Sequence, residues 1–293
     1  MSGSTGSQPS APAPTQPKSR AGRNLPAAIG VGILLGGIAL VSLYVQLWIF
    51  LLVILAAILI GTKELSDALL GRGIRLVRTP LLIAAALLPL VAFVGGAEDG
   101  PRNLVMAMGL MFLFTVVWRL LRYGVEDFVR DSTASSFVLA YAPLMGGFAA
   151  LIAASPDGAD RVMTFIVLSV ASDIGGYAAG VLFGKHPMAP RISPKKSWEG
   201  FAGSVTLQVV LGALLFATLL DSDWWKGALV GAAMTVTATL GDFVESAIKR
   251  DLGIKDMSSL LPGHGGLMDR LDSIIPNTVV AYTLFALTLG GVG

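Results

Sequence analysis

The sequence predicts an all-α, polytopic membrane protein with about nine transmembrane helices and a cytoplasmic N-terminus. Composition is the first reason: of 293 residues, 54% are hydrophobic and 14% charged, against about 25% charged in an average soluble domain. Several windows also approach or exceed the roughly 18 to 20 apolar residues that cross a bilayer as a helix. Finally, the arginines and lysines fall almost entirely in alternate connections between these windows.

The first 24 residues precede the first apolar stretch and are rich in Ser, Gly, Pro and Ala. Such a segment cannot bury enough apolar surface to fold alone, so residues 1–24 are expected to form a disordered cytoplasmic tail. Its basic cluster of Lys18, Arg20 and Arg23 leads into the first span without a clear small-residue cleavage site, unlike a secretory signal. We therefore expect the first span to remain in the mature protein.

Nine apolar stretches follow the tail, and each is expected to form a helix. They cover residues 27–43, 46–62, 79–96, 103–118, 135–154, 162–184, 201–220, 225–248 and 274–291. The first two are short for two crossings, and a single long helix there would leave eight spans. Concentrated polar chemistry is confined to the second half. We therefore divide the chain into N-terminal transmembrane helices, residues 25–154, and a C-terminal transmembrane region, residues 155–293, in which functional residues are expected.

The distribution of basic residues supports nine spans. If the tail is cytoplasmic, eighteen of the 21 lysines and arginines lie in cytoplasmic segments, and the opposite side receives only Arg102, Arg161 and Lys226. This is the bias that the positive-inside rule describes. Eight spans would place the tail opposite the other basic loops. The polar connections of the second half are thus expected to face the cytoplasm, where nucleotides are found.

The absence of cysteine excludes disulfides, thiolate zinc sites and a cysteine nucleophile. Candidate functional residues must therefore come from other polar groups. Asp173 lies near the middle of an otherwise apolar span, where an ionisable group is costly and normally faces a partner or a water-filled cavity. The glycines around it allow close helix approach, and packing alone would explain them. For Asp173 itself, a functional role is favoured.

A basic loop, RISPKKSWEG, occupies residues 191–200. Lys195 and Lys196 supply cationic donors suited to phosphate, and Ser197 supplies a neutral one. The positive-inside rule, or a patch for anionic head groups, would also produce a basic loop. The loop taken alone therefore leaves both interpretations open.

The richest polar segment lies near the C-terminal end. On a helix, Asp242, Glu245 and Lys249 share one face. Asp269 and Asp272 are three residues apart, so a helical turn would aim both carboxylates the same way. Carboxylates converging from these two segments offer the hard oxygen ligands that Mg²⁺ prefers.

Between these carboxylates stands HGG, residues 264–266, whose flexible backbone can approach a phosphate chain closely. Helix caps and surface salt bridges would explain any one of these residues. The whole constellation instead favours a metal-bound polyphosphate.

This segment resembles the phosphatidate cytidylyltransferase family, the CDP-diacylglycerol synthases. The family signature is Ser-x-apolar-Lys-Arg-x4-Lys-Asp, followed after a spacer by His-Gly-Gly-apolar-x-Asp-Arg-apolar-Asp, and it is matched from Ser246 through Asp272. So many fixed positions are far more specific than a lone glycine motif. The similarity extends through ISPKKSWEG and SDIGGYAAGVLFGK and covers roughly residues 165–275.

The resemblance implies transfer of a cytidylyl group from CTP to phosphatidic acid, giving CDP-diacylglycerol and pyrophosphate for phospholipid biosynthesis. It points to Asp242, Asp269 and Asp272 as catalytic residues that hold one or two cations, of which one is Mg²⁺. Lys249 and His264 are expected beside the reacting phosphates. A phosphate nucleophile is already ionised near neutral pH, so His264 ranks below the aspartates. The expected substrate-binding residues are Lys195, Lys196, Ser197, Arg250, Lys255, Arg270 and Asp173.

The resemblance further implies an integral protein of the plasma (inner) membrane, with its active site facing the cytoplasm and membrane lipid as a partner. The family suggests a homodimer, and no nucleic-acid partner is expected. Alternatives are the same chemistry on another lipid phosphate, a membrane transporter, for which Asp173 would mark an ion pathway, and a structural scaffold. The motif of the CDP-alcohol phosphotransferases, Asp-Gly-x2-Ala-Arg-x8-Gly-x3-Asp-x3-Asp, is absent from the sequence.

Overall fold

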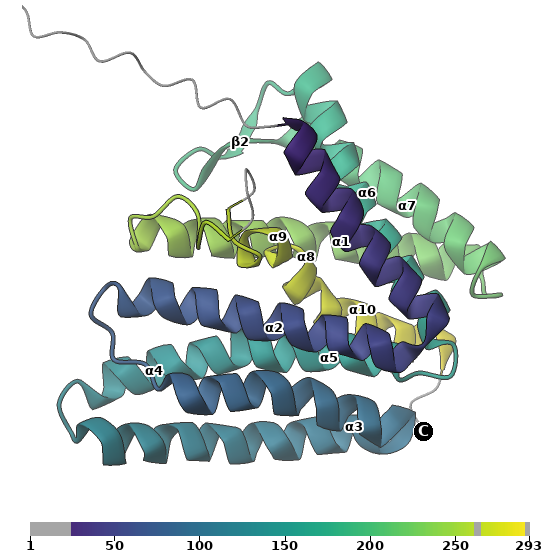
Figure 1. Cartoon of the computed structure of the whole chain (residues 1–293). Helices are drawn as coiled ribbons and strands as arrows, with labels where there is room; N and C mark the ends of the chain where they lie inside the picture. Colours follow the sequence, from purple (N-terminus) through teal and green to yellow (C-terminus); the bar gives the residue numbers. More distant parts are fainter. Residues whose placement is uncertain (1–24, 261–264, 291–293) are drawn as a thin grey trace, which may run out of the picture.

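The computed structural model describes residues 25–260 and 265–290, and helices dominate it (Figure 1). The helices are α1 (Leu25–Val45), α2 (Leu47–Leu70), α3 (Arg78–Tyr123), α4 (Phe128–Leu139), the π-helix η1 (Ala140–Leu144), α5 (Met145–Ala153), α6 (Gly158–Phe183), α7 (Trp198–Thr218), α8 (Trp224–Asp251), α9 (Met268–Leu271) and α10 (Ile274–Leu289). The all-α class is thus confirmed, apart from one small hairpin. The predicted disordered tail, residues 1–24, lies outside the described residues.

The first apolar stretch is divided at Gln46, close to the predicted junction. Gln46 has extended backbone angles, φ −167° and ψ 129°, between two helices. The stretch therefore forms two helices instead of one. The second of them, α2, continues to Leu70, well beyond the predicted end at residue 62. This extension places the side chain of Glu64 inside the protein, where it is 5% exposed.

The element α3 is two helical legs joined at Gly96. Gly96 has φ 66° and ψ −158°, a conformation that interrupts the helix and that L side chains rarely adopt. The legs run antiparallel beside each other (Figure 1), and they correspond to the predicted helices 79–96 and 103–118. The turn between them is tight, because a Cβ on Gly100 would lie 2.5 Å from the carbonyl oxygen of Ala92.

The protein is an integral membrane protein by the length and composition of its helices. Within the described residues, seven helices are long and apolar enough to cross a membrane. They are Leu47–Leu70, Arg78–Tyr123, Phe128–Ala153, Gly158–Phe183, Trp198–Thr218, Trp224–Asp251 and Met268–Leu289. The stretch Gly36–Val45 of α1 is apolar but shorter.

Helices α6, α7 and α8 pack with their backbones in close contact. A Cβ on Gly227 of α8 would lie 2.0 Å from the carbonyl oxygen of Gly212 in α7. A buried amide also joins all three helices: Gln208 Nε2 donates to the Leu168 carbonyl oxygen at 2.6 Å, and Gln208 Oε1 accepts from Thr235 Oγ1. Small residues and interhelical hydrogen bonds are how membrane helices associate, since lipid tails compete for apolar contacts. The loops at the ends of these helices are therefore carried by a tightly packed unit.

The basic loop forms the hairpin that departs from the all-α prediction. Strands β1 (Pro187–Ala189) and β2 (Ser193–Ser197) are antiparallel, with Pro187 opposite Ser197. The Glu199 carboxylate accepts hydrogen bonds from the backbone N–H groups of Lys185 and His186 at 3.1 and 3.2 Å. The hairpin is thus tied to the first turn of α7. Figure 1 shows β2 well away from the turn between α1 and α2, and α9 between β2 and α2.

Candidate active site

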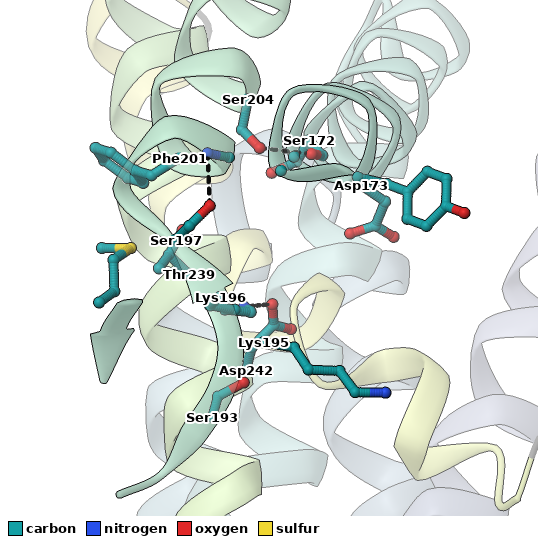
Figure 2. Close-up of a pocket in the computed structure, with 15 residues that line it drawn as sticks. Ser172, Asp173, Ser193, Lys195, Lys196, Ser197, Phe201, Ser204, Thr239 and Asp242 are labelled. Carbon is teal, nitrogen blue, oxygen red and sulfur yellow. Dashed lines mark hydrogen bonds and ion pairs between the residues drawn. The ribbon is translucent and has the colours of Figure 1, made fainter. Parts of the chain in front are cut away.

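A pocket of about 330 Å³ lies between α6, β2, α7 and α8 (Figure 2). Its volume is in the range of small-molecule sites. Its polar lining residues are Ser172, Asp173, Tyr177, Ser193, Lys195, Lys196, Ser197, Ser204, Thr239 and Asp242. Four charged side chains from three elements thus meet around one space. The pocket brings together five of the predicted site residues, namely Asp173, Lys195, Lys196, Ser197 and Asp242.

Lys196 is the central cation of this pocket. Its ammonium group forms an ion pair with Asp242 and lies 5.2 Å from the ring centroid of Phe243. Burial lowers the pKa of Lys196 to about 8, although the charges of Asp272 and Asp173 oppose this change. A partly desolvated ammonium held among carboxylates can exchange one anionic partner for another. It is therefore suited to bind a phosphate that enters the pocket.

Ser197 has a structural contact as well as a place in the pocket. It is the N-cap of α7, and its hydroxyl accepts a hydrogen bond from the Gly200 backbone N–H at 3.1 Å. A serine hydroxyl that accepts a bond still has its own proton to donate. Ser197 can therefore fix the start of α7 and donate to a phosphate from the same position.

A second cluster lies where α8 meets the segment before α10. Lys249 Nζ is 2.5 Å from Glu245 Oε2 and 2.9 Å from Asp269 Oδ1. Asp269 Oδ2 accepts hydrogen bonds from the backbone N–H groups of Met257 and Gly266 at 2.8 and 2.7 Å. Asp269 thus holds both the loop that leads to it and the ammonium group of Lys249 in place.

Asp272 connects the two clusters electrostatically. Its carboxylate interacts with the charges of both Lys196 and Lys249, and its Oδ1 accepts a hydrogen bond from the Ser273 backbone N–H at 2.7 Å. The carboxylates predicted to act together are therefore within one electrostatic neighbourhood.

The described carboxylates do not form a three-ligand metal site. Within residues 25–260 and 265–290, no three His, Asp or Glu side chains lie close enough to hold one metal ion. The sequence-based picture of three converging aspartates does not correspond to such a group, because Asp242 contacts Lys196 while Asp269 contacts Lys249. Mg²⁺ commonly takes only one or two protein carboxylates and completes its shell with water and substrate phosphate. The hard oxygen donors fit Mg²⁺ on those terms.

The remaining predicted residues lie around these clusters. Arg250 and Lys255 are exposed near the C-terminal end of α8, and neither lines the pocket. Arg270 is exposed on α9, next to Asp269. His264 lies outside the described residues, so its role stays a prediction.

Glu64 is a site-proximal residue that the sequence-based prediction did not include. The predicted helix ended at residue 62, which assigned Glu64 to a loop. In the structure its carboxylate contacts the segment before Asp269. An acidic residue at the end of a long apolar run was the available signal.

The fold and the site together define a polytopic membrane protein with a mixed lysine and aspartate site at one end of its helical bundle. The model of the cytidylyltransferase family matches residues 26–288, and the chain belongs to this family. It is 42% identical over 286 residues to a phosphatidate cytidylyltransferase of Mycobacterium leprae, covering 92% of this chain and 89% of the relative.

Two further relatives carry the same name. The phosphatidate cytidylyltransferase of Mycobacterium tuberculosis strain H37Rv is 38% identical over 300 residues, covering 97% of this chain and 90% of the relative. That of Staphylococcus haemolyticus is 30% identical over 247 residues, covering 81% and 92%. The similarity therefore extends well beyond the C-terminal motif that carried the resemblance.

Proposed function

We propose that this protein transfers the cytidylyl group of CTP to phosphatidate, forming CDP-diacylglycerol and pyrophosphate. The observation that carries the proposal is a pocket in which Lys195, Lys196, Asp173 and Asp242 meet, in a chain whose relatives are named for this reaction. The site is also embedded in a bundle of membrane-type helices. A site of this kind suits a reaction between a soluble nucleotide and a lipid head group.

In this reaction a phosphate oxygen of phosphatidate attacks the α-phosphorus of CTP. A new P–O bond forms, the bond from the α-phosphorus to the bridging oxygen of the β-phosphate breaks, and pyrophosphate leaves with that bonding pair. The attacking phosphate is already ionised, so the protein needs chiefly to position the reactants and stabilise charge. Lys195, Lys196 and Ser197 are assigned to phosphate at the pocket, and Lys249, Arg250, Lys255 and Arg270 to the triphosphate and pyrophosphate.

We also propose Mg²⁺ as the cofactor, with Asp242, Asp269 and Asp272 as its protein ligands. Each of the one or two cations would take no more than two of these three aspartates, which the structure does not bring around a single point. When bound, Mg²⁺ would act as a Lewis acid that neutralises charge on the phosphates. The proposal is supported by the chemistry of the donors, since each is a carboxylate. Asp272 also interacts electrostatically with Lys196 and Lys249, the lysines that form ion pairs with Asp242 and Asp269.

The proposed topology has nine crossings, an N-terminus in the cytoplasm and an active site facing the cytoplasm at the plasma membrane. Counting the two legs of α3 separately and including α1 supports the number nine. The basic residues support the orientation, since the opposite side would receive only Arg102, Arg161 and Lys226. A homodimer is also part of the proposal, and light scattering of the purified protein in detergent would measure its mass.

Pyrophosphate release tests the reaction directly. Purified protein in detergent would be given CTP with and without phosphatidic acid, in Mg²⁺ and in excess chelator. We expect release only when lipid and Mg²⁺ are both present. Release from an ether-linked lipid phosphate but not from phosphatidic acid would change the substrate, and no release from folded protein would favour a transporter. Release that persists in excess chelator would remove the metal from the proposal.

A further inference from the structure

Glu64 is a buried carboxylate in the N-terminal half of the chain that contacts the catalytic segment of the C-terminal half. It lies on α2 and is 5% exposed. The C-terminal motif residues it contacts are about 200 positions away in the sequence. Burying a carboxylate is costly unless hydrogen bonds compensate for the lost water. The partners of Glu64 therefore define what the residue does in the fold.

Three donors from the catalytic segment converge on this carboxylate. Oε1 accepts hydrogen bonds from the Ser258 hydroxyl at 2.5 Å and from the Leu267 backbone N–H at 3.1 Å. Oε2 accepts one from the Met268 backbone N–H at 2.7 Å. One side chain thus joins the stretch before residues 261–264 to the stretch after them, and the second stretch begins α9.

Gly266 has no side chain at the point where the Glu64 carboxylate approaches the backbone. A Cβ at that position would lie 2.7 Å from Glu64 Oε2, closer than real Cβ atoms come to other heavy atoms, and 3.0 Å from Oε1. On the other side, the backbone N–H of Gly266 donates to Asp269 Oδ2 at 2.7 Å. The backbone from Gly266 to Met268 is therefore held between two carboxylates, and the absence of a side chain at Gly266 permits both contacts.

We propose that Glu64 is a positioning residue for the reaction. It fixes the backbone of residues 265–268, and through it the segment that carries Asp269, Arg270 and Asp272. Its effect passes through hydrogen bonds to the backbone, so it need not touch substrate. The kinetic part of this proposal rests on the proposed function, whereas the structural part does not.

The substitution Glu64→Gln tests the proposal with little change in shape. Glutamine has one acceptor oxygen, so its NH₂ group must face the N–H of either Leu267 or Met268, whichever way the amide is turned. We expect kcat to fall about 10- to 100-fold, because small misplacements of catalytic groups have effects of this size. The KM for CTP should change less than about threefold, since the pocket around Lys196 keeps its contacts. Ser66→Ala is the matched control, because Ser66 is buried on the same helix and bonds only within it, to the Thr62 carbonyl oxygen.

Hydrogen exchange gives a readout that does not depend on catalysis. By mass spectrometry, peptides that cover residues 265–271 should exchange faster in Glu64→Gln than in wild type or Ser66→Ala, because the N–H group of either Leu267 or Met268 loses its acceptor. Wild-type protein that releases no pyrophosphate would overturn the proposed function, and the exchange experiment would still test Glu64. Unchanged exchange together with kcat within twofold of wild type would overturn the positioning role. So would a loss of kcat matched by Ser66→Ala.

Gly266→Ala provides a second route if Glu64→Gln does not fold. The added methyl group should lower kcat by pushing against the Glu64 carboxylate. In a Glu64→Ala background the same methyl group has space, so the double variant should have nearly the kcat of Glu64→Ala alone. Losses that multiply, as for independent sites, would overturn the proposal.

Discussion

At the scale of single residues, Asp269 has more contacts than its predicted role as a metal ligand requires. One carboxylate oxygen accepts a hydrogen bond from the Lys249 ammonium, and the other accepts hydrogen bonds from two backbone N–H groups. A carboxylate with this many donors has a defined orientation. The same contacts make the residue sensitive to loss of charge, because an amide would turn one acceptor into a donor.

Asp269→Asn should therefore abolish most turnover while leaving membrane insertion intact. We expect kcat to fall about 100-fold or more, through loss of charge stabilisation at the phosphates and loss of the fixed loop. Pyrophosphate release by equal amounts of detergent-purified protein would measure it. Asp251→Asn, an exposed aspartate at the end of α8, is the control. Near-normal turnover of Asp269→Asn at ordinary Mg²⁺ would remove Asp269 from the metal assignment.

Lys196 should make kcat/KM for CTP decrease at alkaline pH, as an alkaline limb of the pH profile. Burial lowers the pKa of its ammonium to about 8, so the side chain is a cation below that pH and neutral above it. We expect kcat/KM for CTP to fall as the pH rises through this value, because a neutral amine binds phosphate more weakly than an ammonium. Arginine keeps its charge throughout this range. Lys196→Arg should therefore lack the limb, and an identical limb in both proteins would assign it to another group.

At the scale of elements, the sequence predicted helices where a long apolar run defined them and erred where a turn or a tertiary contact decided. The apolar runs on either side of Gly96 predicted two helices, and the structure has two legs. The end of α2 was predicted too early, at residue 62, where the charged residues Lys63 and Glu64 follow. In the structure, α2 continues to Leu70, and the Glu64 carboxylate accepts hydrogen bonds from a segment far away in the sequence. No local pattern carries that information.

The candidate site was predictable to a similar degree. Motif spacing identified the residues, and five of them line one pocket. Spacing could not say that lysines would lie between the aspartates, because the ion pair of Lys196 with Asp242 depends on how the hairpin lies over α8. The hairpin itself was missed, since its strands are only three and five residues long.

The packing of α7 against α8 makes a prediction at the same scale. Gly227→Ala would place a methyl group against the backbone of Gly212, which cannot move aside as a flexible side chain could. Overpacking of this kind costs about 1 to 3 kcal/mol. We expect a lower melting temperature in detergent and less pyrophosphate release, because α8 carries Asp242 and Lys249. Gly109→Ala is the matched control, since a Cβ there meets nothing within 4 Å. Equal melting temperatures for both variants would contradict the close packing.

At the scale of the whole molecule, both halves of the chain contribute to one end of the bundle. The pocket is formed by α6, α7, α8 and β2, whereas α2 supplies Glu64 to the segment before α10. The halves also meet inside the bundle, where the Thr278 hydroxyl of α10 donates to the carbonyl oxygen of Met145 in α5 at 2.8 Å. We therefore expect that the C-terminal half would not function alone, because Glu64 of α2 contacts the segment that leads to Asp269.

The absence of cysteine makes the membrane orientation directly measurable, since any introduced thiol is the only one in the protein. Ser259 is exposed in the segment that follows α8, and Asp223 is exposed at the other end of that helix. With nine crossings and a cytoplasmic N-terminus, Ser259→Cys should be labelled by an impermeant maleimide only after the cells are opened. Asp223→Cys should be labelled in intact cells. The ion pair with Lys226 that this variant loses is worth little, because the Asp223 side chain is 58% exposed. The reverse pattern would place the lysine and aspartate site outside, away from CTP, and would contradict both the topology and the reaction proposed for it.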